Sequence, residues 1–177
     1  MVFVNKIKTK AFILKKKILL NKDLLVFLFT EKKGKIAVLA KGVRKINSRR
    51  SSYLETGNLV DVVLDIRNNF YYLKEINLLS GFYQIKKDKE KIKIIYQFFY
   101  ILDKILPEEK EEVNIYNLTK SFFIGISQNN NIKNDTIYKY INRILIKLGY
   151  LKQEVDKKEI EKIFFELTNE KIPSFII

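Results

Sequence analysis

The sequence predicts an α+β protein, with an N-terminal five-stranded OB-fold β-barrel over residues 1–79 and an all-helical domain over residues 80–177. Up to about residue 79, short apolar runs with partial two-residue alternation are separated by turns, which is typical of strands. Beyond that point, apolar residues recur every three or four positions, which is typical of helices. A hydrophobic content of 47% in 177 residues is enough to bury a core in each part.

The strands are expected at Lys10–Lys17, Asp23–Thr30, Lys35–Ala40, Asn58–Ile66 and Phe70–Asn77. Gly34 closes one turn and supplies a positive φ, and Arg67-Asn68-Asn69 closes a second hairpin because Asn tolerates left-handed geometry. In the fourth strand, Val60, Val62 and Leu64 share one face. Five strands in roughly 75 residues fit an OB-type barrel, and an SH3-like barrel has the same strand count.

The second half contains four apolar stripes with helical spacing. Pro107 stops the first helix. The acidic segment that follows can start the second helix, because carboxylates are favourable near a helix N-terminus. The expected helices are Ile92–Leu106, one that starts within Glu108–Val113, one capped by Asn134 or Asp135, and one that starts at Asp156.

The chain is strongly basic, with 34 Lys and Arg against 20 Asp and Glu and a net charge of +14. Such a balance points to a polyanionic partner, either nucleic acid or an anionic membrane surface. Compositional drift toward Lys contributes to this charge, so Arg is more informative. Three of the five arginines fall between Arg44 and Arg50.

The segment from Ala40 to Tyr53 is the first candidate binding site, in a polar loop between the third and fourth strands. Lys and Arg neutralise phosphates, Ser and Asn position them, and a Tyr offers a stacking face to an unpaired base. An ordinary solvated loop is the alternative. The candidate DNA-binding residues here are Lys41, Arg44, Lys45, Arg49, Arg50 and Tyr53.

A second candidate lies at the hairpin between the last two strands, where Arg67 precedes Phe70, Tyr71 and Tyr72. Aromatic residues beside a basic residue suit single-strand stacking, although strand alternation places part of this run in the core. Asp61 and Asp65 lie four residues apart on one strand face, and we assign them to the outer face of the barrel.

Several classes of chemistry are excluded because the chain has no Cys and no His. Zinc fingers, disulfides and Cys–His or Ser–His nucleophiles all require those residues. We find no Gly-rich phosphate loop, so we expect no cofactor and no enzymatic activity. The N-terminus lacks a signal peptide and the apolar runs are short, which predicts a soluble, cytoplasmic protein.

Several short motifs resemble the RecO family of DNA repair proteins. They are Phe29-Thr30, Gly34-Lys35, Ala40-Lys41-Gly42-Val43-Arg44-Lys45, Ser48-Arg49, the strands Leu54–Leu64 and Tyr72–Asn77, and Leu148-Gly149-Tyr150 at the end of a helix. Their order along the chain matches the family. The four-cysteine zinc site that many members carry after the last motif is absent, and the chain is shorter than is usual.

The resemblance implies a non-catalytic recombination mediator. Such a protein binds single- and double-stranded DNA, anneals complementary strands, and acts with RecR to load RecA onto DNA covered by single-strand binding protein. Two alternatives stay open: a protein–protein adaptor whose DNA contact is incidental, and an RNA-binding OB protein, since stacking and phosphate contacts do not distinguish the sugars.

Overall fold

The chain divides into two compact units in the computed structural model, which describes residues 5–20, 23–42, 50–128 and 135–173. The first unit comprises Met1–Gly81 and Leu106–Glu112, and the second comprises Phe82–Ile105 and Val113–Ile177. The first unit therefore includes Leu106–Glu112, a segment from the second half of the predicted division into residues 1–79 and 80–177.

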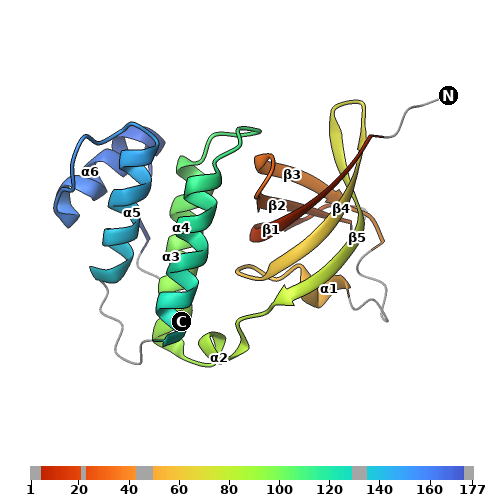
Figure 1. The fold of residues 1–177 in the computed structure, drawn as a ribbon, viewed down its shortest axis with the longest axis horizontal. Helices are drawn as coiled ribbons and strands as arrows, with labels where there is room; N and C mark the ends of the chain where they lie inside the picture. Colours follow the sequence, from red (N-terminus) through yellow and green to blue (C-terminus); the bar gives the residue numbers. More distant parts are fainter. Residues whose placement is uncertain (1–4, 21–22, 43–49, 129–134, 174–177) are drawn as a thin grey trace. The chain divides into compact units, whose positions relative to one another are not determined.

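The first unit is built on five strands that close into a barrel in the order β1-β2-β3-β5-β4 (Figure 1). All neighbours are antiparallel except β3 and β5, which pair in parallel. The strands are β1 (Asn5–Ile18), β2 (Leu24–Thr30), β3 (Gly34–Ala40), β4 (Leu59–Arg67) and β5 (Phe70–Ser80). Five strands followed by helices confirm the α+β class.

The turns follow the predicted chemistry. Gly34 has φ +65°, and Asn68 and Asn69 have φ 49° and 62°, all in the left-handed region that these residues tolerate. The barrel core takes alternate residues of each strand, and Val60, Val62 and Leu64 are fully buried in it as expected. Strand β1 is longer than predicted, because the alternation before Lys10 involves polar side chains on its outer face.

The helix expected to start within Glu108–Val113 begins at the last residue of that range, and the preceding segment Leu106–Glu112 is not helical. Its backbone adds to the barrel instead, because the Glu109 N–H donates to the Lys35 carbonyl at 2.8 Å and Glu108 forms a bridge with Lys35. Glu109 also has φ 54°, which interrupts any helical turn. The next helix begins only at Val113.

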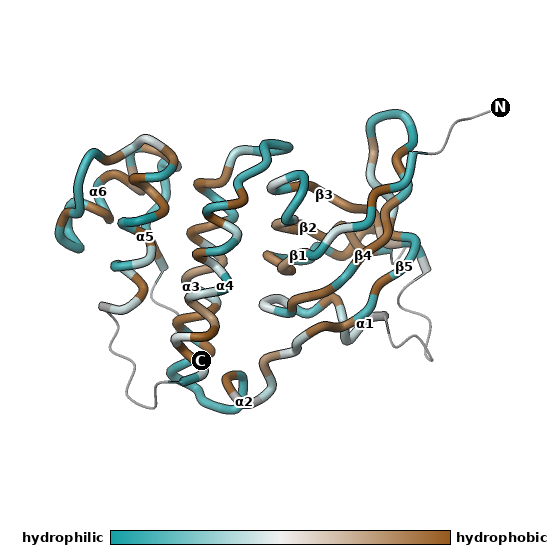
Figure 2. Tube along the Cα trace, in the orientation of Figure 1, coloured by the Kyte–Doolittle hydropathy of each residue, from teal (hydrophilic) through white to brown (hydrophobic). Residues whose placement is uncertain are grey.

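The second unit is helical, with hydrophobic residues gathered along one side of each long helix (Figure 2). Its core contains stacked rings, such as Phe98 against Phe122 at 3.8 Å between centroids. Lys91, on the first of the long helices, is buried despite its charge. The helices are α2 (Tyr83–Lys86), α3 (Lys89–Ile105), α4 (Val113–Gln128), α5 (Asp135–Lys147) and α6 (Lys157–Thr168).

Candidate nucleic-acid interface

Part of the predicted basic loop lies outside the described residues, namely Arg44, Lys45 and Arg49. Arg50 begins the short helix α1 (Arg50–Tyr53), which the sequence did not predict, and its side chain is not described either. Their participation in binding stays a prediction. The described part of the interface is therefore the barrel surface next to this loop.

Tyr53 lies at the end of α1 and is half-buried against the barrel core, rather than displayed as an open stacking face. The buried Asn58 side chain holds this turn, because its amide nitrogen donates to the carbonyls of Ser52 and Tyr53, each at 3.0 Å. The return from the predicted loop to the barrel is thus fixed by hydrogen bonds from one side chain to the backbone.

Two of the predicted residues, Lys41 and Arg67, meet at one aromatic ring. Lys41 follows the end of β3, and Arg67 ends β4. Their cationic groups lie 5.5 Å and 5.7 Å from the centroid of the Tyr72 ring, within the range of a cation–π contact. The parallel register of β3 and β5 explains this meeting, since it places Leu39 directly opposite Tyr72. We call these three residues the Tyr72 cluster.

Asp65 completes the surroundings of the Tyr72 cluster. It lies opposite Tyr72 in the β4–β5 register, and its Oδ2 accepts a hydrogen bond from the Arg67 guanidinium at 3.0 Å. Strand alternation assigns it to the outer face, as predicted, yet its side chain is only 6% exposed. The cluster therefore holds two cations against one buried carboxylate, which leaves a local excess of positive charge.

The hairpin beyond the cluster displays an exposed aromatic ring. Phe70 pairs with Arg67 across the turn and is 66% exposed, whereas its neighbour Tyr71 is buried in the barrel core. Burial raises the pKa of the Tyr71 phenol above 10.0, with a further contribution from the charge of Glu109. Of the three consecutive aromatics, Phe70 and Tyr72 face outward and Tyr71 faces inward.

An apolar strip extends from the cluster across β3 and β2. The register places Leu25 opposite Leu39 and Phe27 opposite Ala37, and these four outward-facing residues are all at least partly exposed. On the next strand, Lys15 and Lys17 lie opposite Phe27 and Leu25. The Lys15 ammonium reaches over the Phe27 ring at 4.4 Å. Basic side chains thus flank the strip on both sides.

A β-bulge creates the basic edge on β1. The register between β1 and β2 shifts between Ile13 and Lys15, so one extra residue enters β1 there. Simple alternation from the buried Ile13 would direct Lys15 and Lys17 into the barrel, and the bulge turns both to the outer face. Sequence reasoning missed these lysines as binding candidates, because a bulge depends on pairing with a partner strand.

The strip has a defined end at Lys35, the first outward-facing residue of β3 after the turn. The Glu108 carboxylate lies 3.9 Å from its ammonium group, and Lys35 is buried beneath the segment Leu106–Glu112. The accessible part of β3 therefore begins at Ala37 and leads to the Tyr72 cluster, whose Lys41 directly follows the strand.

Neither a metal site nor a membrane span is found where the structure describes the chain. No three His, Cys, Asp or Glu side chains gather there in a way that would hold an ion. None of the described helices combines the length and the apolar character needed to cross a bilayer.

Comparison with known proteins identifies the barrel. Residues 3–82 match the family model described as "Recombination protein O N terminal". Over these residues, the chain matches the RecO family. The resemblance predicted from the motifs around the basic loop is thereby confirmed.

Relatives named "DNA repair protein RecO" match most of this chain. Those of Caldanaerobacter subterraneus and a Thermoanaerobacter species are each 26% identical, over 82% and 83% of this chain, respectively. That of Clostridium novyi is 30% identical over 68% of this chain. The alignments cover 59%, 59% and 48% of these relatives, so the chain spans about half the length of the relatives that it matches.

Proposed function

We propose that this chain is a non-catalytic, DNA-binding recombination mediator in DNA repair. The observation that carries the proposal is the convergence of Lys41 and Arg67 on Tyr72, at the end of an apolar strip on a RecO-type barrel. Cationic groups beside an aromatic ring serve both parts of a single strand, since phosphates bind the cations and unpaired bases stack on rings.

The connectivity of the barrel supports its assignment as an OB-fold. Its strands follow the order β1-β2-β3-β5-β4 with a single parallel pair, and OB-folds bind oligonucleotides on the face of strands 2 and 3 and on two flanking loops. The apolar strip lies on that face, and the hairpin with Phe70 corresponds to one of those loops.

The wider role follows from the family. We propose binding of both single- and double-stranded DNA, annealing of complementary strands, and action with RecR and single-strand binding protein in loading RecA. A basic surface favours annealing because it reduces the repulsion between two phosphate backbones. The residues we assign to DNA are Lys41, Arg44, Lys45, Arg49, Arg50 and Arg67, with Tyr72 and Phe70 as aromatic contacts.

Fluorescence anisotropy of a labelled single-stranded DNA oligonucleotide, titrated over a salt series, tests the proposal. Lys41→Ala combined with Arg67→Ala should weaken binding and flatten the salt slope by about 1.4, because each single-strand phosphate contact contributes about 0.7. The matched control is Arg143→Ala with Lys152→Ala, which removes the same charges from the helical unit.

An unchanged slope in the barrel variant, or equal losses in both variants, would contradict the proposal. A competition arm with a matched RNA oligonucleotide separates the alternatives. Displacement of DNA by RNA at equal concentration would assign the surface to RNA instead, because DNA lacks the 2′-hydroxyl.

A further inference from the structure

We propose that Asp65 is a positioning residue, which fixes the Arg67 guanidinium against Tyr72 in the orientation that receives a DNA phosphate. This inference rests on the proposed function. Asp65 itself contacts no DNA in this arrangement, because its carboxylate is buried beneath the arginine that it holds.

The burial of Asp65 indicates a role beyond barrel stability. Its Oδ2 pairs with Arg67, whereas its Oδ1 is buried with no hydrogen-bond partner among the described residues. A buried carboxylate with one oxygen unpaired costs free energy of folding, and an apolar side chain would avoid that cost. Among the described residues, this carboxylate pairs with an arginine whose side chain is 53% exposed.

The strand geometry places Asp65 and Tyr72 so that both contact the Arg67 guanidinium. Asp65 and Arg67 are two residues apart on β4, so their side chains leave the same face. Tyr72 lies directly opposite Asp65 on β5, and its ring contacts the guanidinium from there. The planar guanidinium donates one hydrogen bond to Asp65, and most of its N–H donors remain available for a phosphate.

Such pre-organisation lowers the entropy lost on binding, because the long arginine side chain is ordered before DNA arrives. Simple electrostatics predicts the opposite effect of Asp65, since a carboxylate near the site repels phosphates. The two explanations therefore differ in the sign of the change when the negative charge is removed.

The decisive variant is Asp65→Asn, measured by anisotropy with a single-stranded DNA oligonucleotide. If Asp65 positions Arg67, the Kd rises about 3- to 10-fold even though the net charge becomes more positive. The matched control is Asp61→Asn, on the same strand and face, where the carboxylate pairs with Lys8 at 3.4 Å. It removes the same charge and should leave the Kd unchanged or slightly lower.

A double-mutant cycle separates positioning from an effect on the fold. In an Arg67→Ala background, Asp65→Asn should cause no further loss of affinity. An equal loss in both backgrounds, or tighter binding by Asp65→Asn alone, would overturn the inference. If wild-type protein shows no salt-dependent binding at all, the proposed function fails instead.

Arg67→Lys provides a second test that leaves Asp65 and Tyr72 themselves unchanged. Lysine keeps the charge but lacks the planar fork that Asp65 and Tyr72 hold. We expect this variant to weaken binding to a similar extent as Asp65→Asn, while thermal unfolding stays close to that of the wild type. Wild-type affinity in Arg67→Lys would show that charge alone is needed and would contradict positioning.

Discussion

Gly34 lies so close to Lys110 that no other residue fits at the start of β3. A β-carbon built on Gly34 would lie 1.8 Å from the Lys110 carbonyl oxygen and 2.6 Å from its carbonyl carbon. Gly34 also has φ +65°, which L-residues with a side chain rarely adopt. The turn and the packing of Leu106–Glu112 on the barrel therefore both depend on glycine at this position.

We predict that Gly34→Ala destabilises the protein by about 2 kcal/mol or more, because it combines the left-handed strain with a backbone clash. Urea unfolding measures the loss. The control is Gly149→Ala, at φ +83° with nothing within 4 Å, which carries the strain alone and should cost about 1 kcal/mol. Equal losses would show that the approach of Lys110 contributes nothing.

The sequence predicts features that depend on neighbouring residues. The turn at Gly34, the hairpin at Asn68 and Asn69, and the inward face of β4 follow from local conformational preferences and two-residue alternation. The RecO resemblance also follows from motifs that are each a few residues long. These parts of the prediction are confirmed because no distant segment is needed to specify them.

Features that depend on pairing between distant segments were missed. The segment Leu106–Glu112 has an acidic composition that suits a helix start. Its backbone nevertheless pairs with Lys35, which lies about 70 residues earlier in the sequence. The bulge that turns Lys15 outward arises from the register with β2. The meeting of Lys41 and Arg67 at Tyr72 results from the β3–β5 pairing, which no local pattern contains.

Phe70 is predicted to stack on an unpaired base. Phe70→Ala should weaken binding to single-stranded DNA by about 1–3 kcal/mol and affect double-stranded DNA much less, because bases in a duplex are already stacked. Anisotropy with both probes checks this. Leu79→Ala, which truncates another exposed apolar side chain on β5, should leave both affinities unchanged. Equal losses on the two probes from Phe70→Ala would argue against stacking.

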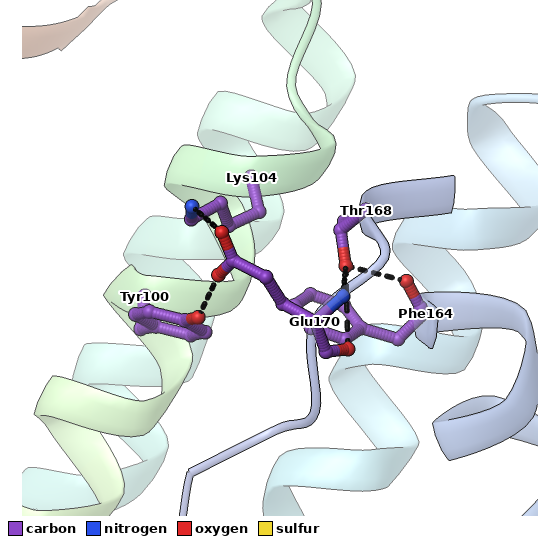
Figure 3. A network of polar contacts seen from close by, with 5 residues as sticks. All are labelled: Tyr100, Lys104, Phe164, Thr168 and Glu170. Carbon is purple, nitrogen blue, oxygen red and sulfur yellow. Dashed lines mark hydrogen bonds and ion pairs between the residues drawn. The ribbon is translucent and has the colours of Figure 1, made fainter. Parts of the chain in front are cut away.

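Tyr100 gives the helical unit a predicted sensitivity to alkaline pH. Its phenol donates to Glu170, which also pairs with Lys104 (Figure 3). Burial, and then the interaction with Glu170, raise the pKa of Tyr100 from 10.0 to about 12. The stabilisation from the protonated phenol is therefore complete below pH 10 and is lost as the pH rises through 12.

Thermal unfolding of the wild type and Tyr100→Phe between pH 9 and 12, roughly the range of tyrosine ionisation, tests this linkage. The wild type should lose stability more steeply over this range than the variant, which has no phenol to ionise. Tyr150→Phe, which removes an exposed phenol, should follow the wild type. Parallel curves for wild type and Tyr100→Phe would contradict the linkage.

Asn58 is predicted to couple barrel stability to DNA binding. Its buried amide donates to the carbonyls of Ser52 and Tyr53, so Asn58→Ala leaves two carbonyls without this partner and should cost about 1–3 kcal/mol in urea unfolding. Because α1 connects the basic residues before it to the barrel, DNA affinity should also fall at temperatures where the variant is folded. Asn77→Ala, at an exposed position on β5, should change neither quantity. Loss of stability with unchanged affinity would show that the anchoring of α1 is independent of the DNA-binding surface.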